Sequence, residues 1–237
     1  MKKGLLTMLA LLSMGSVFAQ DYSGPDARVV TARKGVLQVQ LSSSTSYRDL
    51  QFDLTLPAGI SLVTESVSPD APDATNVKEA AAGHVIAYNP VGDNAVRFAV
   101  YDQTNGNAFT EGVLIEIPVE ASDAFTDNAV AAVTNVVTSD ADAVSYAKNS
   151  FNINILLNLL GDVNEDNDVD VQDIVCVISD IQHDTPTIFN RGAADIDNEG
   201  NIDVQDVVGI VDIIQNQHPS STAKEIVINE YSEIEPE

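Results

Sequence analysis

The last part of the chain repeats itself, and this repeat limits what the region can fold into. Residues 161–181 superpose on residues 194–214 at an offset of 33 residues, and acidic or amide side chains coincide at alternate positions of the two copies. Apolar residues in the second half of each copy recur at spacings of three and four, the spacing of one helix face: Ile174, Val175, Ile178 and Ile181, then Val207, Val208, Val211 and Ile214. Each copy therefore predicts a polar loop followed by an apolar helix.

Both predicted loops carry side-chain oxygens in the pattern that calcium requires. Calcium takes about six to eight oxygen ligands, and a twelve-residue loop can supply them from positions 1, 3, 5, 7, 9 and 12, with position 7 using its backbone carbonyl. The candidate ligands of the first loop are Asp162, Asn164, Asp166, Asp168, Asp170 and Asp173. Those of the second loop are Asp195, Asp197, Glu199, Asn201, Asp203 and Asp206. We therefore expect two bound calcium ions.

Position 6 of such a loop makes a sharp turn, which suits a residue that tolerates the left-handed conformation. Gly200 occupies this position in the second loop, and Asn167, the next best residue type, occupies it in the first. Val169, at position 8, is expected to point into the core. Glu199 places a longer acid at position 5 and must fold back to bind, so the second site is expected to be weaker or looser.

The negative charge of the chain also indicates bound cations. The formal net charge is -25, and residues 161–215 contain 14 Asp or Glu against a single Arg191. A surface of this kind repels phosphate backbones, which argues against nucleic-acid binding. An acidic segment can also be disordered, but the regular spacing of Ile and Val favours a folded unit whose repulsion is relieved by bound cations.

The segments Gly161-Asp-Val-Asn-Glu-Asp and Ala193-Ala-Asp-Ile-Asp-Asn-Glu-Gly resemble the two repeats of a type I dockerin, a small all-α calcium-binding module. No helix is expected before Asp162, so each repeat corresponds to half of an EF-hand. The resemblance implies a cohesin-domain partner, on another chain or as the N-terminal domain of a second copy. It also implies partner contacts at loop positions 10 and 11: Val171, Gln172, Val204 and Gln205. The same residues could instead serve only to pack the helix N-termini.

Residues 20–157 read as short β-strands separated by polar turns, which predicts a two-sheet sandwich. A further strand is expected at His84, with turns at Asn89-Pro90 and at Gly92-Asp93-Asn94. The alternating runs are Leu37-Val39-Leu41, Leu50-Phe52-Leu54-Leu56, Val96-Phe98-Val100, Val113-Ile115-Ile117-Val119 and Phe151-Ile153-Ile155. Their order resembles a cohesin-like domain, whose jelly-roll-like sandwich is shared with some carbohydrate-binding modules.

The N-terminus has the features of a cleaved signal peptide. Met1-Lys2-Lys3 precedes a short apolar run and a small-residue end at Ala19, and no later segment reaches the ~20 apolar residues of a membrane span. We expect a signal peptide at 1–19, a cohesin-like β-sandwich at 20–157, a dockerin at 158–216 and an acidic mobile tail at 217–237. The protein is expected to be secreted or displayed at the cell surface, with the periplasm as an alternative.

Residues with catalytic or sugar-binding chemistry are sparse. His84, His183 and His218 are scattered without partners at metal-ligand spacing, so an enzyme is not expected. There is no tryptophan to stack on sugar rings, although Tyr47, Tyr88 and Tyr101 could substitute. The single cysteine, Cys176, excludes a disulfide within the chain and is expected to be a small buried residue.

Two functions fit these features. The first is a secreted, calcium-dependent adaptor that joins proteins of an extracellular or surface assembly, a setting that the dockerin resemblance links to polysaccharide degradation. The second is a carbohydrate-binding or adhesin module that its dockerin attaches to a scaffold. A truncated accessory enzyme is a third, weaker reading.

Overall fold

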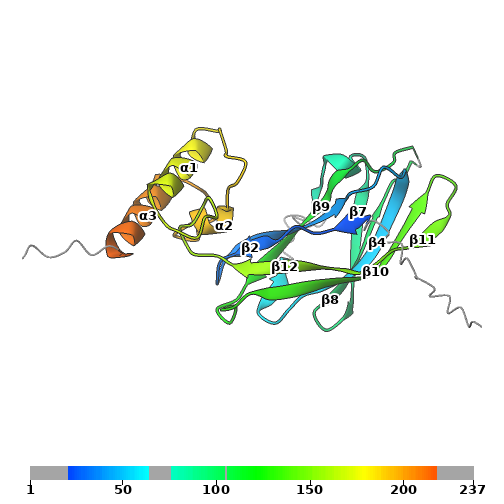
Figure 1. Ribbon diagram of the computed structural model, residues 1–237, viewed down its shortest axis with the longest axis horizontal. Helices are drawn as coiled ribbons and strands as arrows, with labels where there is room; N and C mark the ends of the chain where they lie inside the picture. The colour runs from blue at the N-terminus through cyan, green and yellow to red at the C-terminus, as the bar shows by residue number, and fades with distance from the viewer. Residues whose placement is uncertain (1–20, 64–75, 105, 218–237) are drawn as a thin grey trace, which may run out of the picture.

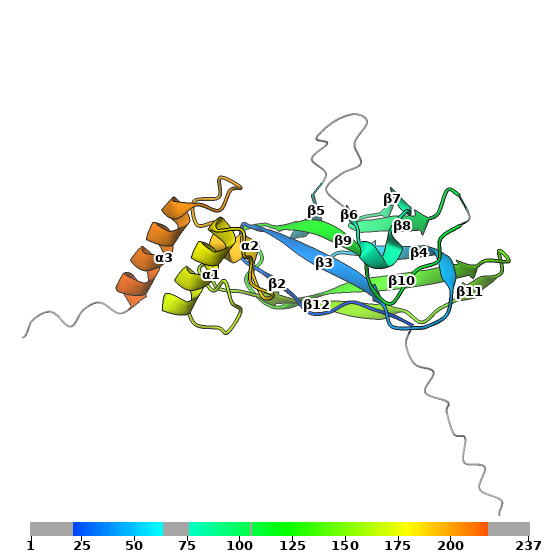
Figure 2. The ribbon, with the colours of Figure 1, turned by 90° about the horizontal axis from the view of Figure 1, so that it is seen from above.

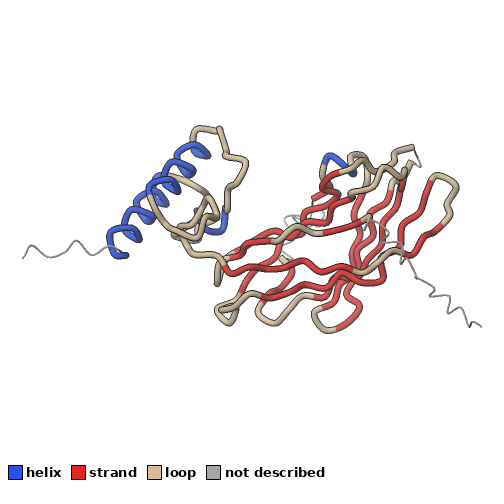
Figure 3. Tube along the Cα trace, in the orientation of Figure 1, coloured by secondary structure: helices blue, strands red, loops and turns tan. Residues whose placement is uncertain are grey.

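The computed structural model describes residues 21–63, 76–104 and 106–217, which form a β-sandwich followed by a small helical part (Figure 1, Figure 2). The predicted signal peptide at 1–19 and residues 218–237 of the predicted tail lie outside these residues, whereas Gln217, the first residue of that tail, ends the last helix. Strands occupy the chain up to Leu157 and the three α-helices follow Asp170 (Figure 3). Within the described ranges, no helix is long and apolar enough to cross a membrane.

The larger sheet has seven strands, in the order β2-β12-β10-β4-β8-β7 with β11 paired to β10. These are β2 (Ala27–Val29), β4 (Tyr47–Thr55), β7 (Val85–Gly92), β8 (Ala95–Tyr101), β10 (Ala129–Asp140), β11 (Ser145–Ala147) and β12 (Phe151–Leu157). All neighbours pair antiparallel except β12 and β2, which are parallel. This parallel pair places the start of the sandwich beside its end, where the helical part begins.

The smaller sheet has the order β1-β3-β9-β5, with β6 also paired to β9, and it is antiparallel throughout. Its strands are β1 (Tyr22–Ser23), β3 (Lys34–Leu41), β5 (Ile60–Leu62), β6 (Asn76–Val77) and β9 (Gly112–Ala121). A short 3-10 helix, η1 (Glu79–Ala81), follows β6. The long pair β3 and β9 forms the middle of this layer.

One core joins the two sheets. Residues at alternate positions of the long strands other than β7 are buried in it, such as Leu37 and Val39 on β3, and the Phe52 and Phe98 rings stack with centroids 5.3 Å apart. Each of the five predicted alternating runs forms a strand, namely β3, β4, β8, β9 and β12. The expectation of a mainly β sandwich is confirmed.

Two of the longer strands differ from the sequence expectation. β10, with 12 residues, was not predicted, because a bulge at Asn135 (φ 51°) moves its buried positions from Ala131 and Val133 to Val136 and Thr138 and so breaks the period of two. The expected turn at Asn89-Pro90 is wrong, since β7 runs through Pro90 to Gly92. β7 is an edge strand, and a proline is tolerated there because its missing N–H faces away from the sheet.

The bulge in β10 also completes a polar network on β4. Asp53 is buried and accepts two hydrogen bonds from the Arg97 guanidinium, at 2.6 and 2.8 Å, and a third from the Asn135 amide at 2.7 Å. These bonds, the one from Arg97 foremost, lower the pKa of Asp53. The charged carboxylate is therefore the form that this network stabilises.

The helical part comprises α1 (Val171–Ile181), α2 (Arg191–Ala194) and α3 (Val204–Gln217). Its own small core consists of Val163, Val169, Val177, Ala194 and Ile210. The inward placement of Val169 is thus confirmed. Val177 and Ile210, which coincide at the offset of 33, are the fully buried apolar residues where α1 and α3 contact each other.

The predicted apolar faces of α1 and α3 are only half right. Ile174, Ile181, Val207 and Ile214 do pack on this core. Val175, Ile178 and Val208 were expected beside them but are exposed. Each helix carries two apolar stripes, and only one of them finds a partner within the described residues.

Candidate calcium loops

Two loops of matching backbone shape lead into α1 and α3. In the first loop Glu165 and Asn167 have positive φ angles of 64° and 74°, and at the equivalent positions of the second loop Asn198 and Gly200 have φ angles of 62° and 91°. The left-handed turn predicted for position 6 is confirmed in both loops. The same conformation at position 4 was not foreseen, because Glu165 has no intrinsic preference for it.

The second loop gathers three carboxylates. Oxygen atoms of Asp195, Asp197 and Asp206 lie within 4.8 Å of one another. Asp195 Oδ1 is buried and has no hydrogen-bond partner. A buried carboxylate oxygen without a partner is costly unless a cation satisfies it. The donor set, three hard anionic oxygens, is the kind that calcium prefers.

Asp206 is held in place by the backbone of its own loop. Its two carboxylate oxygens accept hydrogen bonds from the N–H groups of Ile196, at 2.8 Å, and Asp203, at 2.9 Å. Asp203 in turn accepts a bond from the Gln205 N–H at the start of α3, at 2.7 Å. The N-terminus of α3 therefore fixes the position of a carboxylate that closes the loop.

The first loop repeats this arrangement around Asp173. This fully buried residue accepts hydrogen bonds from the N–H groups of Val163, Asn164 and Asp170, at 2.7, 3.1 and 2.8 Å. Asp170 also caps α1 by accepting a bond from the Gln172 N–H at 2.6 Å. Asp173 thus occupies the same structural place as Asp206 in the second loop.

Asp162 opens the first loop and is fully buried. Its carboxylate oxygens accept hydrogen bonds from the N–H groups of Asp166 and Asn167, both at 3.1 Å. Burial raises the pKa of Asp162, and the nearby carboxylates of Asp173 and Asp166 add to this effect. A bound cation at this point would stabilise the charged Asp162 carboxylate and so lower its pKa, against the effects of burial and of the neighbouring acids.

The two sets of predicted ligands are arranged differently. Among the residues that the structure describes, three acids converge in the second loop but no such group of three His, Cys, Asp or Glu side chains forms in the first. In the first loop the Asn164 amide donates to Asp166 at 2.9 Å, and Asp168 is exposed. Glu199 and Asn201 are exposed in the second loop. The assignment of these residues as calcium ligands stays a prediction.

The four predicted partner contacts lie on the surface. Val171 and Val204 are 65% and 66% exposed, and Gln172 and Gln205 are exposed beside them. One turn further on, Val175 and Val208 are 57% and 56% exposed. We call these valines, with Ile178 on α1, the paired stripes. Val175 and Val208 were missed as surface residues, although their coincidence at the offset of 33 was visible in the sequence.

Other predicted residues have structural places. His84 is buried, and its two ring nitrogens each lie 2.9 Å from a backbone oxygen, of Ala81 and of Arg48. Cys176 is half-buried against the helical core, and burial raises the pKa of its thiol. Both residues are parts of the packing.

The three tyrosines proposed as a sugar-stacking surface do not come together. Tyr47 is buried, and Tyr88 packs against Phe98 of the core with ring centroids 5.8 Å apart. Tyr101 is exposed. These three residues therefore do not form a common platform.

No family model and no curated protein matches the chain. Similar solved structures are cohesin modules. That of a family 33 glycoside hydrolase from Clostridium perfringens is 11% identical, with a TM-score of 0.47 over 59% of this chain and 96% of that one. The sixth cohesin of scaffoldin B from Acetivibrio cellulolyticus, in complex with a dockerin, is 13% identical, with a TM-score of 0.45 over 58% of this chain and 99% of that one. A non-cellulosomal cohesin from Archaeoglobus fulgidus is 11% identical, with a TM-score of 0.44 over 58% and 91%. Likeness at this level carries no inference about function.

Proposed function

We propose that the chain is an exported, non-enzymatic adaptor whose C-terminal residues 158–216 act as a type I dockerin with two calcium ions. The observation that carries the proposal is the second loop, where carboxylates of Asp195, Asp197 and Asp206 converge and one oxygen of Asp195 is buried without a hydrogen-bond partner. The first loop supports it, because the same backbone turns and the same buried acid recur at the offset of 33.

Calcium would act by fixing the shape of the loops. Residues 161–215 have 14 acids and one basic residue, and the helical core has only five fully or nearly buried apolar residues. A core of this size stabilises a fold weakly, and small domains are commonly stabilised by a metal. Asp162, Asp173, Asp195 and Asp206 would hold the ions, while the backbone N–H groups around them keep these acids in position.

The paired stripes support docking to a protein partner. The four valines of the stripes are more than half exposed, and large apolar side chains lose contact with water favourably when a partner covers them. The four valines of the stripes lie in the first two turns of α1 and α3, directly after the two loops, so calcium would fix their spacing. In keeping with the dockerin resemblance, we propose a cohesin domain as the partner. The sandwich would then be the second interaction module, and the assembly would serve polysaccharide degradation.

A pull-down of the full chain on a panel of immobilised cohesin domains tests this proposal. Binding is expected in calcium and not in chelator, and it should be lost in the double variant Val171→Asp/Val204→Asp. Val91→Asp is the matched control, since this exposed valine lies on β7 of the sandwich. If no cohesin binds in calcium, or if the double variant binds like the control, the dockerin function is wrong. A partner that is the sandwich of a second copy would show as concentration-dependent mass in light scattering.

A further inference from the structure

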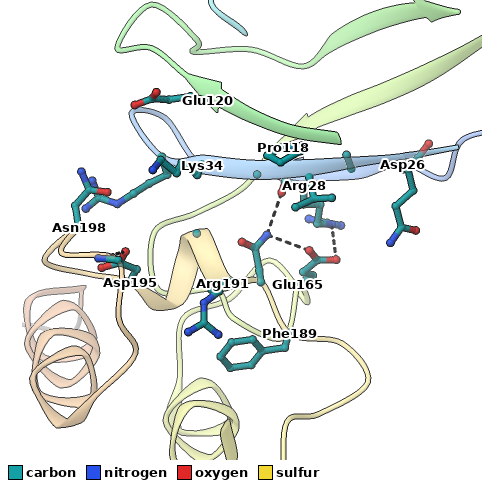
Figure 4. A pocket seen from close by; sticks show the side chains of 18 of the residues that line it. Asp26, Arg28, Lys34, Pro118, Glu120, Glu165, Phe189, Arg191, Asp195 and Asn198 are labelled. Atoms are coloured by element: carbon teal, nitrogen blue, oxygen red, sulfur yellow. Dashed lines mark hydrogen bonds and ion pairs between the residues drawn. The ribbon is translucent and has the colours of Figure 1, made fainter. Parts of the chain in front are cut away.

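The two modules of this chain contact each other through the calcium loops. The connection from β12 to the first loop spans only residues 158–161, and a cleft of about 800 Å³ lies between the two parts (Figure 4). The sandwich contributes Arg28, Arg33 and Lys34 to this cleft, and the loops contribute Glu165, Asp195 and Glu199. In a chain of net charge -25, the cations of the sandwich thus meet the most acidic part of the molecule.

Arg28, on β2, reaches the first loop. Its Nη1 donates to Asn167 Oδ1 at 2.8 Å, and its Nε lies 3.9 Å from Glu165 Oε2. Asn190, just before α2, donates from its amide to the Arg28 backbone oxygen at 3.1 Å and to Glu165 Oε1 at 3.0 Å. These contacts connect the sandwich to positions 4 and 6 of the loop, the two positions with left-handed backbone.

Arg33, just before β3, reaches the second loop. Its Nη2 donates to the backbone oxygen of Ile196 at 2.8 Å, and the N–H of Ile196 donates to Asp206. Next to it, Gly192 of α2 lies so close to β3 that an added Cβ would be 2.4 Å from the Lys34 oxygen. Only a residue without a side chain allows this approach.

Loop shape, rather than loop charge, decides whether these contacts form. The shorter arginine bonds end on neutral oxygens, the Asn167 amide and the Ile196 carbonyl, whose positions depend on the backbone of each loop. The charged contact with Glu165 is longer and partly exposed, and such pairs contribute about 0–1 kcal/mol. Neutralising the loops would therefore cost the interface little, whereas disordering them would remove its acceptors.

We propose that calcium locks the sandwich and the helical module into one orientation through this interface, and that removing calcium releases the helical module. The inference rests on the calcium binding proposed above. Its consequence is that the paired stripes point in a fixed direction relative to the sandwich only in the calcium form. By linkage, an intact interface also strengthens calcium binding by the same factor by which calcium strengthens the interface.

Nuclear spin relaxation of the full chain measures the rotational correlation time of each module separately. In calcium, the wild type should show one shared correlation time. In chelator, residues 158–217 should lose this shared value and show faster motion than the sandwich. Gly192→Ala should show the same loss in calcium, because the new methyl group separates α2 from β3 without changing any charge. Gly92→Ala is the matched control, since its Cβ would meet Ala95 at an ordinary 3.7 Å.

Calcium titration by calorimetry on the same samples separates the two ideas. A wild type that takes up no calcium would overturn both the calcium site and the lock. A wild type that binds calcium but keeps one correlation time in chelator would overturn the lock alone, as would a Gly192→Ala protein that tumbles like the control. Arg33→Ala serves as a second variant should Gly192→Ala fail to fold, and it should also lose the shared correlation time.

Discussion

Position 6 of the two loops offers a matched test of why the first loop has asparagine where the second has glycine. Both residues are left-handed, Asn167 at φ 74° and Gly200 at φ 91°. Of these two residues, only Asn167 has a side chain that contacts the sandwich, since its Oδ1 accepts the hydrogen bond from Arg28. The variants Asn167→Gly, Asn167→Ala and Gly200→Ala therefore separate backbone conformation from this hydrogen bond.

The expected sizes follow from the geometry. A Cβ added to Gly200 meets nothing within 4 Å, so Gly200→Ala is a purely conformational change. The left-handed conformation costs an alanine about 1–2 kcal/mol, while the stiffer unfolded chain returns about 0.4–1 kcal/mol, so the net loss of stability is about 1 kcal/mol. Asn167→Ala should be less stable than Asn167→Gly by the same ~1 kcal/mol.

Asn167→Gly should itself be less stable than the wild type. It removes one hydrogen bond to a charged donor, which is worth about 1.5–3 kcal/mol when buried and about 1 kcal/mol at this exposed position. Urea unfolding followed by helical circular dichroism, at one fixed calcium concentration, measures all three variants. A Gly200→Ala protein as stable as the wild type would refute the conformational argument. An unchanged Asn167→Gly protein would refute the role of the hydrogen bond.

Three further outcomes are expected. Asp195→Ala should remove calcium binding at one of the two sites in calorimetry, whereas Asp212→Ala, an exposed acid on α3, should leave both sites intact. If the two stripes are equivalent, either Val171→Asp or Val204→Asp alone should weaken the binding of a cohesin partner by about RT ln 2, roughly 0.4 kcal/mol. A single variant that abolishes binding would exclude this equivalence. The Arg97 guanidinium lowers the pKa of the Asp53 carboxyl. The contribution of Asp53 to stability is therefore present above the unfolded pKa of about 3.9 and is lost as the pH falls through the lower folded value. Asp53→Asn should flatten the acid limb of the stability profile measured by urea unfolding.

The sequence predicts local features of this protein well because most of them depend on spacing alone. Alternation identified β3, β4, β8, β9 and β12, and the offset of 33 aligned two loops that share their left-handed turns. Prediction from spacing failed where the local pattern is interrupted. β10 was missed because the bulge at Asn135 shifts its buried face, and β7 was cut short because Pro90 is tolerated at a sheet edge.

Which apolar face of a helix is buried depends on what lies opposite, and spacing does not contain that information. α1 and α3 each have enough apolar residues for two stripes, and their mutual contact selects Val177 and Ile210. The contacts of Arg28 and Arg33 with the loops were equally invisible, because they join residues separated by more than 130 positions in the chain. The sequence showed the residue types of the candidate site, and only the fold shows how the two modules meet.

Calorimetric titration of the full chain with calcium tests the central claim most directly, with helical circular dichroism recorded on the same samples. Two ions per chain are predicted, with a gain of helical signal on binding that chelator reverses, because the acids of residues 161–215 need cations to converge. A titration without heat, together with identical spectra in calcium and in chelator, would contradict the account.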